Sequence, residues 1–142
     1  MTDDPWRRQD ALARTTVVWA AASIAAGVVA LRRNDRWARA FGGQHLGWGV
    51  IDLGIVAVVT VLQRRRMVRA GDPYAPAARE RERRQLHRVL AINTAADVGY
   101  VVVGAVLATR KDPRAAGAGA AIVIQGAFLA AHDGWHAVRS RS

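Results

Sequence analysis

The sequence predicts an all-α protein, built as an antiparallel bundle of four transmembrane helices. Four apolar segments occupy residues 15–31, 46–62, 89–108 and 115–131 of the 142-residue chain. Each is close to the roughly 20 residues that a helix needs to cross a ~30 Å hydrocarbon layer. Arginine is absent from these segments and gathers at their ends, which is typical of membrane spans. We therefore expect one membrane domain that covers residues 1–142.

The composition supports a membrane protein and excludes several kinds of site. The mean hydropathy of +0.02 averages apolar spans with very basic connections, and the net charge is +10. Because the arginines flank the spans, we expect their partners to be anionic lipid headgroups rather than nucleic acid, at about 1 kcal/mol for each residue near the surface. The chain has no cysteine, which excludes disulfides and cysteine-ligated metal centres.

The distribution of basic residues predicts the orientation. The N-terminal segment, the connection at residues 63–88 and the C-terminal segment carry 14 of the 21 Lys and Arg residues. Positive charge favours the cytoplasmic side, so both termini and this connection are expected in the cytoplasm of a multi-pass protein. Twenty of those 21 residues are arginine, and with the abundant alanine and valine this bias suggests a bacterial protein of the cytoplasmic (plasma) membrane.

The first span is predicted to be a structural helix that packs closely against its neighbours. Ser23 is its one polar residue apart from the threonines at its start, and Ala22, Ala26 and Ala30, with Ser23 and Gly27 alongside, form a strip of small residues that permits close helix contact. Before this span, Trp6 lies beside two arginines, a pattern typical of an anchor at headgroup level.

The connections between the spans carry turn signals. Gly71-Asp72-Pro73 and Pro76 predict a turn within the basic cytoplasmic connection 63–88. After this turn, residues 77–87 are expected to be helical and to continue into the third span. Asp112-Pro113 predicts a tight turn between the third and fourth spans, which makes those spans antiparallel neighbours.

Polar residues inside the second, third and fourth spans fall on one stripe of each helix, at about 100° per residue. We expect these stripes to face a shared interior, with Asp97 and Gln125 turned toward each other near mid-bilayer, about 14 and 15 Å from opposite faces at ~1.5 Å per residue. The candidate ligand-binding residues of this interior are Trp48, Asp52, Asn93, Asp97, Tyr100 and Gln125.

Two interpretations of this polar interior compete. In the structural one, the polar groups hydrogen-bond across helices, at an average of about 0.6 kcal/mol each. In the functional one, they bind a ligand, since a central Asp costs about 2.5–3.5 kcal/mol to insert and Asn or Ser would join helices at lower cost. The sequence favours a non-enzymatic ligand-binding or accessory subunit, with a homo-oligomer or another membrane protein as a possible partner. The alternative is a proton- or cation-translocating protein that uses Asp52 and Asp97.

A histidine pair suggests a metal site. His132 and His136 are four residues apart on one helical face, a spacing that lets both imidazoles reach one divalent metal ion. The candidate third ligand is His87, expected on the same side of the membrane, or Asp133. The other interpretation places the pair at the lipid interface, where histidine side chains extend toward water. A membrane enzyme would require this metal.

Three segments resemble a family of small uncharacterised bacterial four-helix membrane proteins. The segments are residues 47–52 (GWGVID), 93–100 (NTAADVGY) and 124–129 (IQGAFL), and the resemblance covers residues 43–133. Asp52 stands where that family has Asn, which adds an ionisable group. The resemblance implies the four-helix fold and the polar stripe, and it implies no activity.

Overall fold

The computed structural model describes residues 4–139, and in them the chain forms four α-helices and no strand. The helices are α1 (Pro5–Leu31), α2 (Arg36–Arg69), α3 (Pro76–Ala108) and α4 (Pro113–Arg139). Each of the four is long and apolar enough to cross a membrane. The prediction of an all-α, four-helix membrane protein is therefore confirmed, and every predicted span lies inside one of these helices.

The helix boundaries follow from capping residues, prolines and one glycine. The carboxylate of Asp35 precedes α2 and accepts a hydrogen bond from the backbone N–H of Ala38 at 2.7 Å. α3 and α4 begin at Pro76 and Pro113, where a proline does not cost a helical hydrogen bond. Gly71 has a φ of +70°, the left-handed conformation that allows the chain to turn after α2. The predicted turns are thus confirmed.

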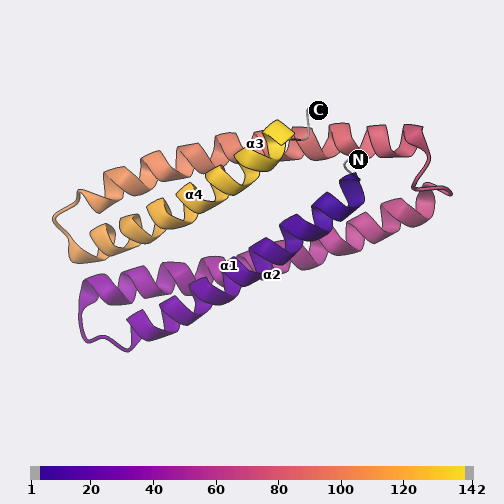
Figure 1. Cartoon of the computed structure of the whole chain (residues 1–142). Coiled ribbons are helices and arrows are strands. Elements are labelled where there is room, and N and C mark those ends of the chain that lie inside the picture. Colours follow the sequence, from indigo (N-terminus) through magenta and orange to yellow (C-terminus); the bar gives the residue numbers. More distant parts are fainter. Residues whose placement is uncertain (1–3, 140–142) are drawn as a thin grey trace.

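The helices form two hairpins, one from α1 and α2 and one from α3 and α4 (Figure 1). The hairpins meet mainly where α2 packs against α4, with a smaller contact between α1 and α3. Within residues 4–139, the backbones of α2 and α3 stay apart although the two helices are consecutive, and the helices meet through side chains such as Arg66 with Glu82 and Trp48 with Tyr100. We call the end of the molecule with both termini and the α2–α3 loop the terminal end, and the end with the other two loops the loop end (Figure 1).

Glycines bring the helices of each hairpin into close contact. A Cβ atom on Gly27 would lie 2.7 Å from the carbonyl oxygen of Gly42, across the α1–α2 contact. A Cβ atom on Gly119 would lie 2.6 Å from the carbonyl oxygen of Gly104, across the α3–α4 contact. Such separations exclude any side chain, so these glycines fix how the paired helices are rotated. Gly99, by contrast, has nothing within 4 Å of its Cβ position.

The predicted small-residue strip of α1 lies in the helix contact only in part. Ser23 and Gly27 are buried in the contact with α2, and so is Ala20. Ala22 and Ala26, two of the alanines on which the prediction depended, are exposed. The backbones approach at Gly42 and Gly49 of α2: Gly42 lies against Gly27 and Ala30, and Gly49 lies against Ala20.

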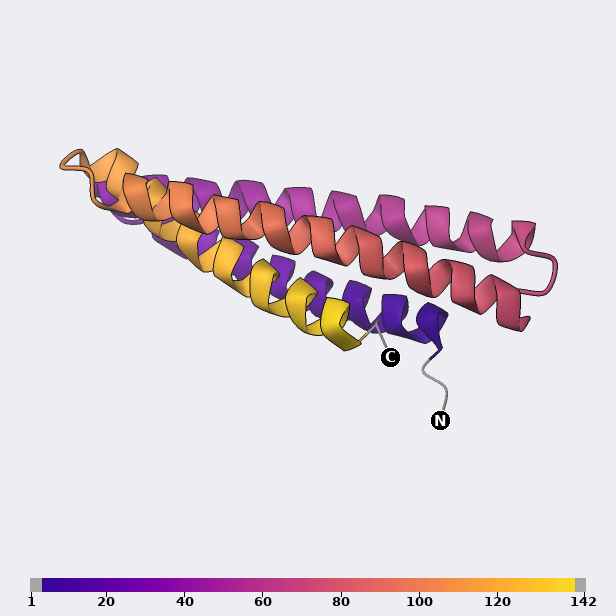
Figure 2. The ribbon, with the colours of Figure 1, turned by 90° about the horizontal axis from the view of Figure 1, so that it is seen from above.

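α2 and α3 are longer than a membrane is thick. They contain 34 and 33 residues, which at ~1.5 Å per residue is about 50 Å, against ~30 Å of hydrocarbon. Their excess length projects past α1 and α4 at the terminal end (Figure 2). Residues 77–87 continue into the third span as predicted, but residues 63–69 are also helical, so only residues 70–75 of the predicted connection form a loop.

A network of hydrogen bonds joins α1, α2 and α3 at the terminal end. Gln9 donates from Nε2 to Glu82 Oε1 at 2.8 Å, and Arg66 donates from Nε to the same oxygen at 3.0 Å. Trp6 is 4% exposed, and its indole Nε1 donates to the carbonyl oxygen of Pro73 at 2.9 Å. Trp6 therefore packs inside the protein, and the prediction of a headgroup anchor is wrong because the projecting ends of α2 and α3 cover it.

Candidate functional site

A chain of hydrogen bonds in the apolar part of the molecule joins three helices. Gln125 of α4 donates from Nε2 to Asp52 Oδ2 of α2 at 2.7 Å. Its Oε1 accepts a hydrogen bond from the indole Nε1 of Trp19 in α1 at 2.8 Å. Asp52 is 3% exposed and Gln125 is 2% exposed. Because the amide of Gln125 uses both of its ends, it connects the two hairpins at mid-helix level.

The sequence predicted that Gln125 would face Asp97, but it faces Asp52. It is the next residue, Gly126, that faces α3. A Cβ atom on Gly126 would lie 3.1 Å from the carbonyl oxygen of Asp97 and 3.0 Å from Val101 Cγ2. At 100° per residue, this rotation directs Gln125 away from α3 and toward α1 and α2.

A cleft of about 490 Å³ lies between the hairpins and is lined by residues of all four helices. Along α2 its lining runs from Trp48 to Arg66, which at ~1.5 Å per residue is about 27 Å. Apolar residues form most of the wall, among them Ile55, Val59, Leu62, Leu86, Leu90 and Leu129. Polar residues stand at intervals: Gln9, Asp52, Arg66, Glu82, Gln85, Asn93, Asp97, His132 and Asp133.

Most of the charged groups in this cleft already have partners. Arg66 donates from Nη2 to Glu82 Oε1 at 2.9 Å. Asp133 Oδ1 lies 3.1 Å from Nδ1 of His132, and Asp52 accepts from Gln125 as above. Asp97 is half-buried and, within residues 4–139, its carboxylate has no hydrogen-bond or ion-pair partner. Asp97 is thus the acid in the cleft that is available to a bound molecule.

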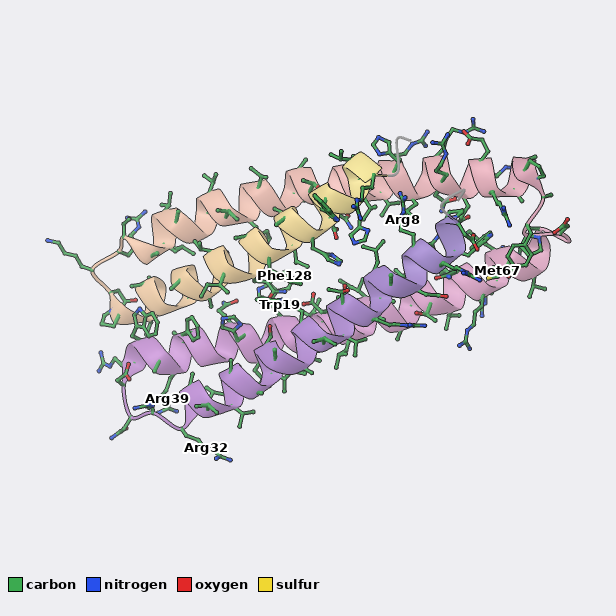
Figure 3. All side chains as sticks on the ribbon, viewed as in Figure 1. Arg8, Trp19, Arg32, Arg39, Met67 and Phe128 are labelled. Atoms are coloured by element: carbon green, nitrogen blue, oxygen red, sulfur yellow. The ribbon has the colours of Figure 1, made fainter. Side chains whose placement is uncertain are left out.

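Aromatic rings continue the site along α4. Trp19 stacks on Phe128 with ring centroids 3.9 Å apart and an interplanar angle of 8°, and Figure 3 shows the two side chains between the hairpins. Phe128 stacks in turn on His132 at 5.6 Å. Trp19 was missed by sequence reasoning, which treated the first span as structural only. Its signal was available, because an indole N–H in an otherwise aliphatic span needs a partner.

The predicted binding residues separate into two groups. Trp48, Asp52, Asn93 and Asp97 line the cleft together. Gln125 lies behind Asp52, to which it is bonded. Tyr100 is not in the lining and is 43% exposed; its ring meets that of Trp48 edge-on, with centroids 5.1 Å apart.

The family model described as "Family of unknown function (DUF6992)" matches residues 15–134. The chain belongs to this family. The match includes the apolar segments of all four helices and the polar residues of the site, from Trp19 to Asp133, and it confirms the resemblance to a family without an assigned activity. Of the cleft-lining residues, Gln9, Leu12 and Ala13 lie outside the matched range. No curated protein and no solved structure matches the chain.

The structure of this DUF6992 chain brings two of the three predicted metal ligands together. The rings of His132 and His136 have centroids 5.1 Å apart. His87 is placed differently, with Nδ1 3.0 Å from the carbonyl oxygen of Ala137. Among residues 4–139, no three His, Cys, Asp or Glu side chains are arranged to hold a metal ion. Two imidazoles without a third ligand fall short of the three protein ligands of a catalytic zinc site.

Proposed function

We propose that this DUF6992 protein binds a small molecule inside the membrane, in the cleft between its two hairpins. The observation that carries the proposal is Asp97, a mid-membrane carboxylate that lines this cleft and has no partner among the described residues. A central Asp costs about 2.5–3.5 kcal/mol to insert, and intramembrane ionisable groups usually face a functional cavity. Unlike Asp52, Asp97 does not offset this cost by joining helices.

The dimensions of the cleft suit a ligand. Its volume of about 490 Å³ lies within the roughly 300–1,000 Å³ of small-molecule sites, and like those sites it combines an apolar wall with a few polar groups. α2 and α3, which flank it, have well-separated backbones and meet through side chains near the two ends of the cleft, Trp48 with Tyr100 and Arg66 with Glu82. A molecule dissolved in the lipid could therefore enter sideways between them.

Translocation of protons or cations is the second candidate, because it uses the same two acids. It is supported by Asp52 and Asp97 occurring in one cleft. Between Asp97 and the terminal end the lining mixes apolar residues, such as Val59 and Leu62, with polar ones, such as Asn93 and Gln85, so a measurement of flux has to separate the two functions. Flux into proteoliposomes that is lost in Asp97→Asn would favour translocation over binding.

The proposed location is the bacterial cytoplasmic membrane, with the terminal end in the cytoplasm and its arginines against anionic headgroups. This orientation is testable because the chain has no native cysteine. A cysteine that replaces Tyr74 in the α2–α3 loop (Tyr74→Cys) should react with an impermeant maleimide only in inside-out vesicles. A cysteine at Lys111, in the α3–α4 loop, should react in intact cells, and the reverse pattern would contradict the orientation.

The binding function is tested by filling the cleft. Ala96 of α3 lines the cleft and its neighbour Ala95 does not, while both are exposed, so Ala96→Trp and Ala95→Trp form a matched pair. Mass spectrometry of protein purified gently from native membranes should find a small molecule with the wild type and with Ala95→Trp, and should not find it with Ala96→Trp. Equal retention by both variants, or nothing retained by the wild type, would refute the proposal.

A further inference from the structure

We infer that the ligand of the cleft is a lipophilic organic cation, with its positive group beside Asp97 and its apolar body along α2 and α3. The inference rests on the binding function proposed above, and it adds the chemical class of the ligand.

The lining of the cleft is acidic, which favours a cation. The cleft is lined by four carboxylates, Asp52, Glu82, Asp97 and Asp133, and by one guanidinium, that of Arg66. The whole chain carries a net charge of +10, so the cleft is acidic in a very basic protein. Charges removed from water need an opposite charge nearby. Among the described residues, a permanently charged cation, that of Arg66, lies against Glu82, whereas Asp133 contacts an imidazole and Asp97 has no partner.

The positions of the acids carry the second step. Arg66 and Glu82 are paired at the terminal end of the cleft, at 2.9 Å. The other three acids, Asp52, Asp97 and Asp133, lie deeper in the cleft. Among the described lining residues, the one basic side chain near these three carboxylates is His132, which contacts Asp133, and this excess of acids favours a cationic occupant and repels an anionic one.

A buried histidine marks the same place. The side chain of His132 is 9% exposed, lines the cleft, and contacts Asp133 through Nδ1. Its Nε2 is buried and has no hydrogen-bond partner within residues 4–139. Buried polar atoms in native proteins are rarely left without a partner. An unpartnered nitrogen beside the acids indicates that a polar group of a ligand completes this part of the cleft.

The lining of the cleft favours an organic cation over a metal ion. A metal cation would need several oxygen or nitrogen ligands converging on one point, and the described residues offer no group of three. From Asp97 to the terminal end, the wall is formed largely by Val59, Leu62, Leu86 and Leu90. Such a wall stabilises an apolar body by about 25 cal/mol for each Å² of surface removed from water.

The test uses two probes of the same shape and opposite charge, tetraphenylphosphonium and tetraphenylborate, in equilibrium dialysis of the purified protein in a neutral detergent. We expect saturable binding of tetraphenylphosphonium to the wild type and to Ala95→Trp. Ala96→Trp should abolish it. Asp97→Asn should weaken it by ~30-fold, which is the effect expected when one partner of a desolvated charge pair loses its charge. Asp97→Glu, which keeps the carboxylate, should recover most of the affinity.

Several outcomes would overturn the inference. Saturable binding of tetraphenylborate, unchanged affinity in Asp97→Asn, or no saturable binding of either probe would each do so. If the probes fail while a neutral or zwitterionic molecule is retained in an Ala96→Trp-sensitive way, only the cationic class is wrong. If nothing of any charge is retained in that way, the binding function itself fails.

Discussion

The hydrogen-bond chain through Gln125 gives the sharpest prediction about stability. In Gln125→Leu, the side chain keeps a similar volume but loses the contacts at 2.7 Å to Asp52 and 2.8 Å to Trp19. Two interhelical hydrogen bonds average about 0.6 kcal/mol each, and leaving a buried group such as Asp52 unsatisfied adds about 1–3 kcal/mol. We expect the free energy of unfolding to fall by about 3 kcal/mol.

The assay is reversible unfolding in mixed micelles, followed by the helical circular dichroism signal. Two companion variants separate the contributions. Trp19→Phe removes one hydrogen bond and leaves Asp52 satisfied, so it should cost about 1 kcal/mol. The double variant Asp52→Leu/Gln125→Leu removes both members of the buried pair and should be more stable than Gln125→Leu alone by about 1 kcal/mol or more. A Gln125→Leu variant within about 0.5 kcal/mol of the wild type would refute the reasoning.

Two further predictions use pairs of residues that differ mainly in burial. Gly104→Ala should destabilise the protein by about 1–3 kcal/mol, because its Cβ would lie 2.8 Å from Ile122 Cγ2. Gly99→Ala, with open space at its Cβ, should be neutral or slightly stabilising. Equal effects of the two variants in the same unfolding assay would contradict the glycine contact. Glu82→Leu should lower the free energy of unfolding by about 2 kcal/mol, because it leaves Arg66 and Gln9 without their shared acceptor. Glu80→Leu should lower it by about 0.5 kcal/mol, since the ion pairs of Glu80 are partly exposed. Similar losses of stability in both variants would show that the buried network is unimportant.

The fold could be predicted from the sequence because its signals are local. Apolar length and arginine at the span ends determine the four helices, and Pro76 and Pro113 mark where two of them begin. The helical start of α3 was expected after the turn at Pro76, and it carries an ion pair between Glu80 and Arg84, four residues apart, at 3.0 Å. The polar stripes of α2 and α3 predicted that Asp52 and Asp97 face a shared interior, and both residues line the same cleft.

The contacts across the site could not be predicted, because they depend on how the helices rotate against one another. Gln125 binds Asp52 rather than Asp97, since Gly126 turns toward α3. The close contacts that fix this rotation involve glycines, whose spacing in the sequence does not say which helix they will meet. The network of Gln9 and Glu82 was missed for a related reason: it joins residues 73 positions apart at a level outside the apolar spans.

The central claim is that a molecule occupies the space between α2 and α3 and touches Asp97. A density map of the protein purified gently from its native membrane tests this most directly. The account predicts non-protein density in the cleft, with a polar group within hydrogen-bond distance of the Asp97 carboxylate. A map in which α2 and α3 close against each other, or in which Asp97 bonds to the protein in an empty cleft, would contradict it.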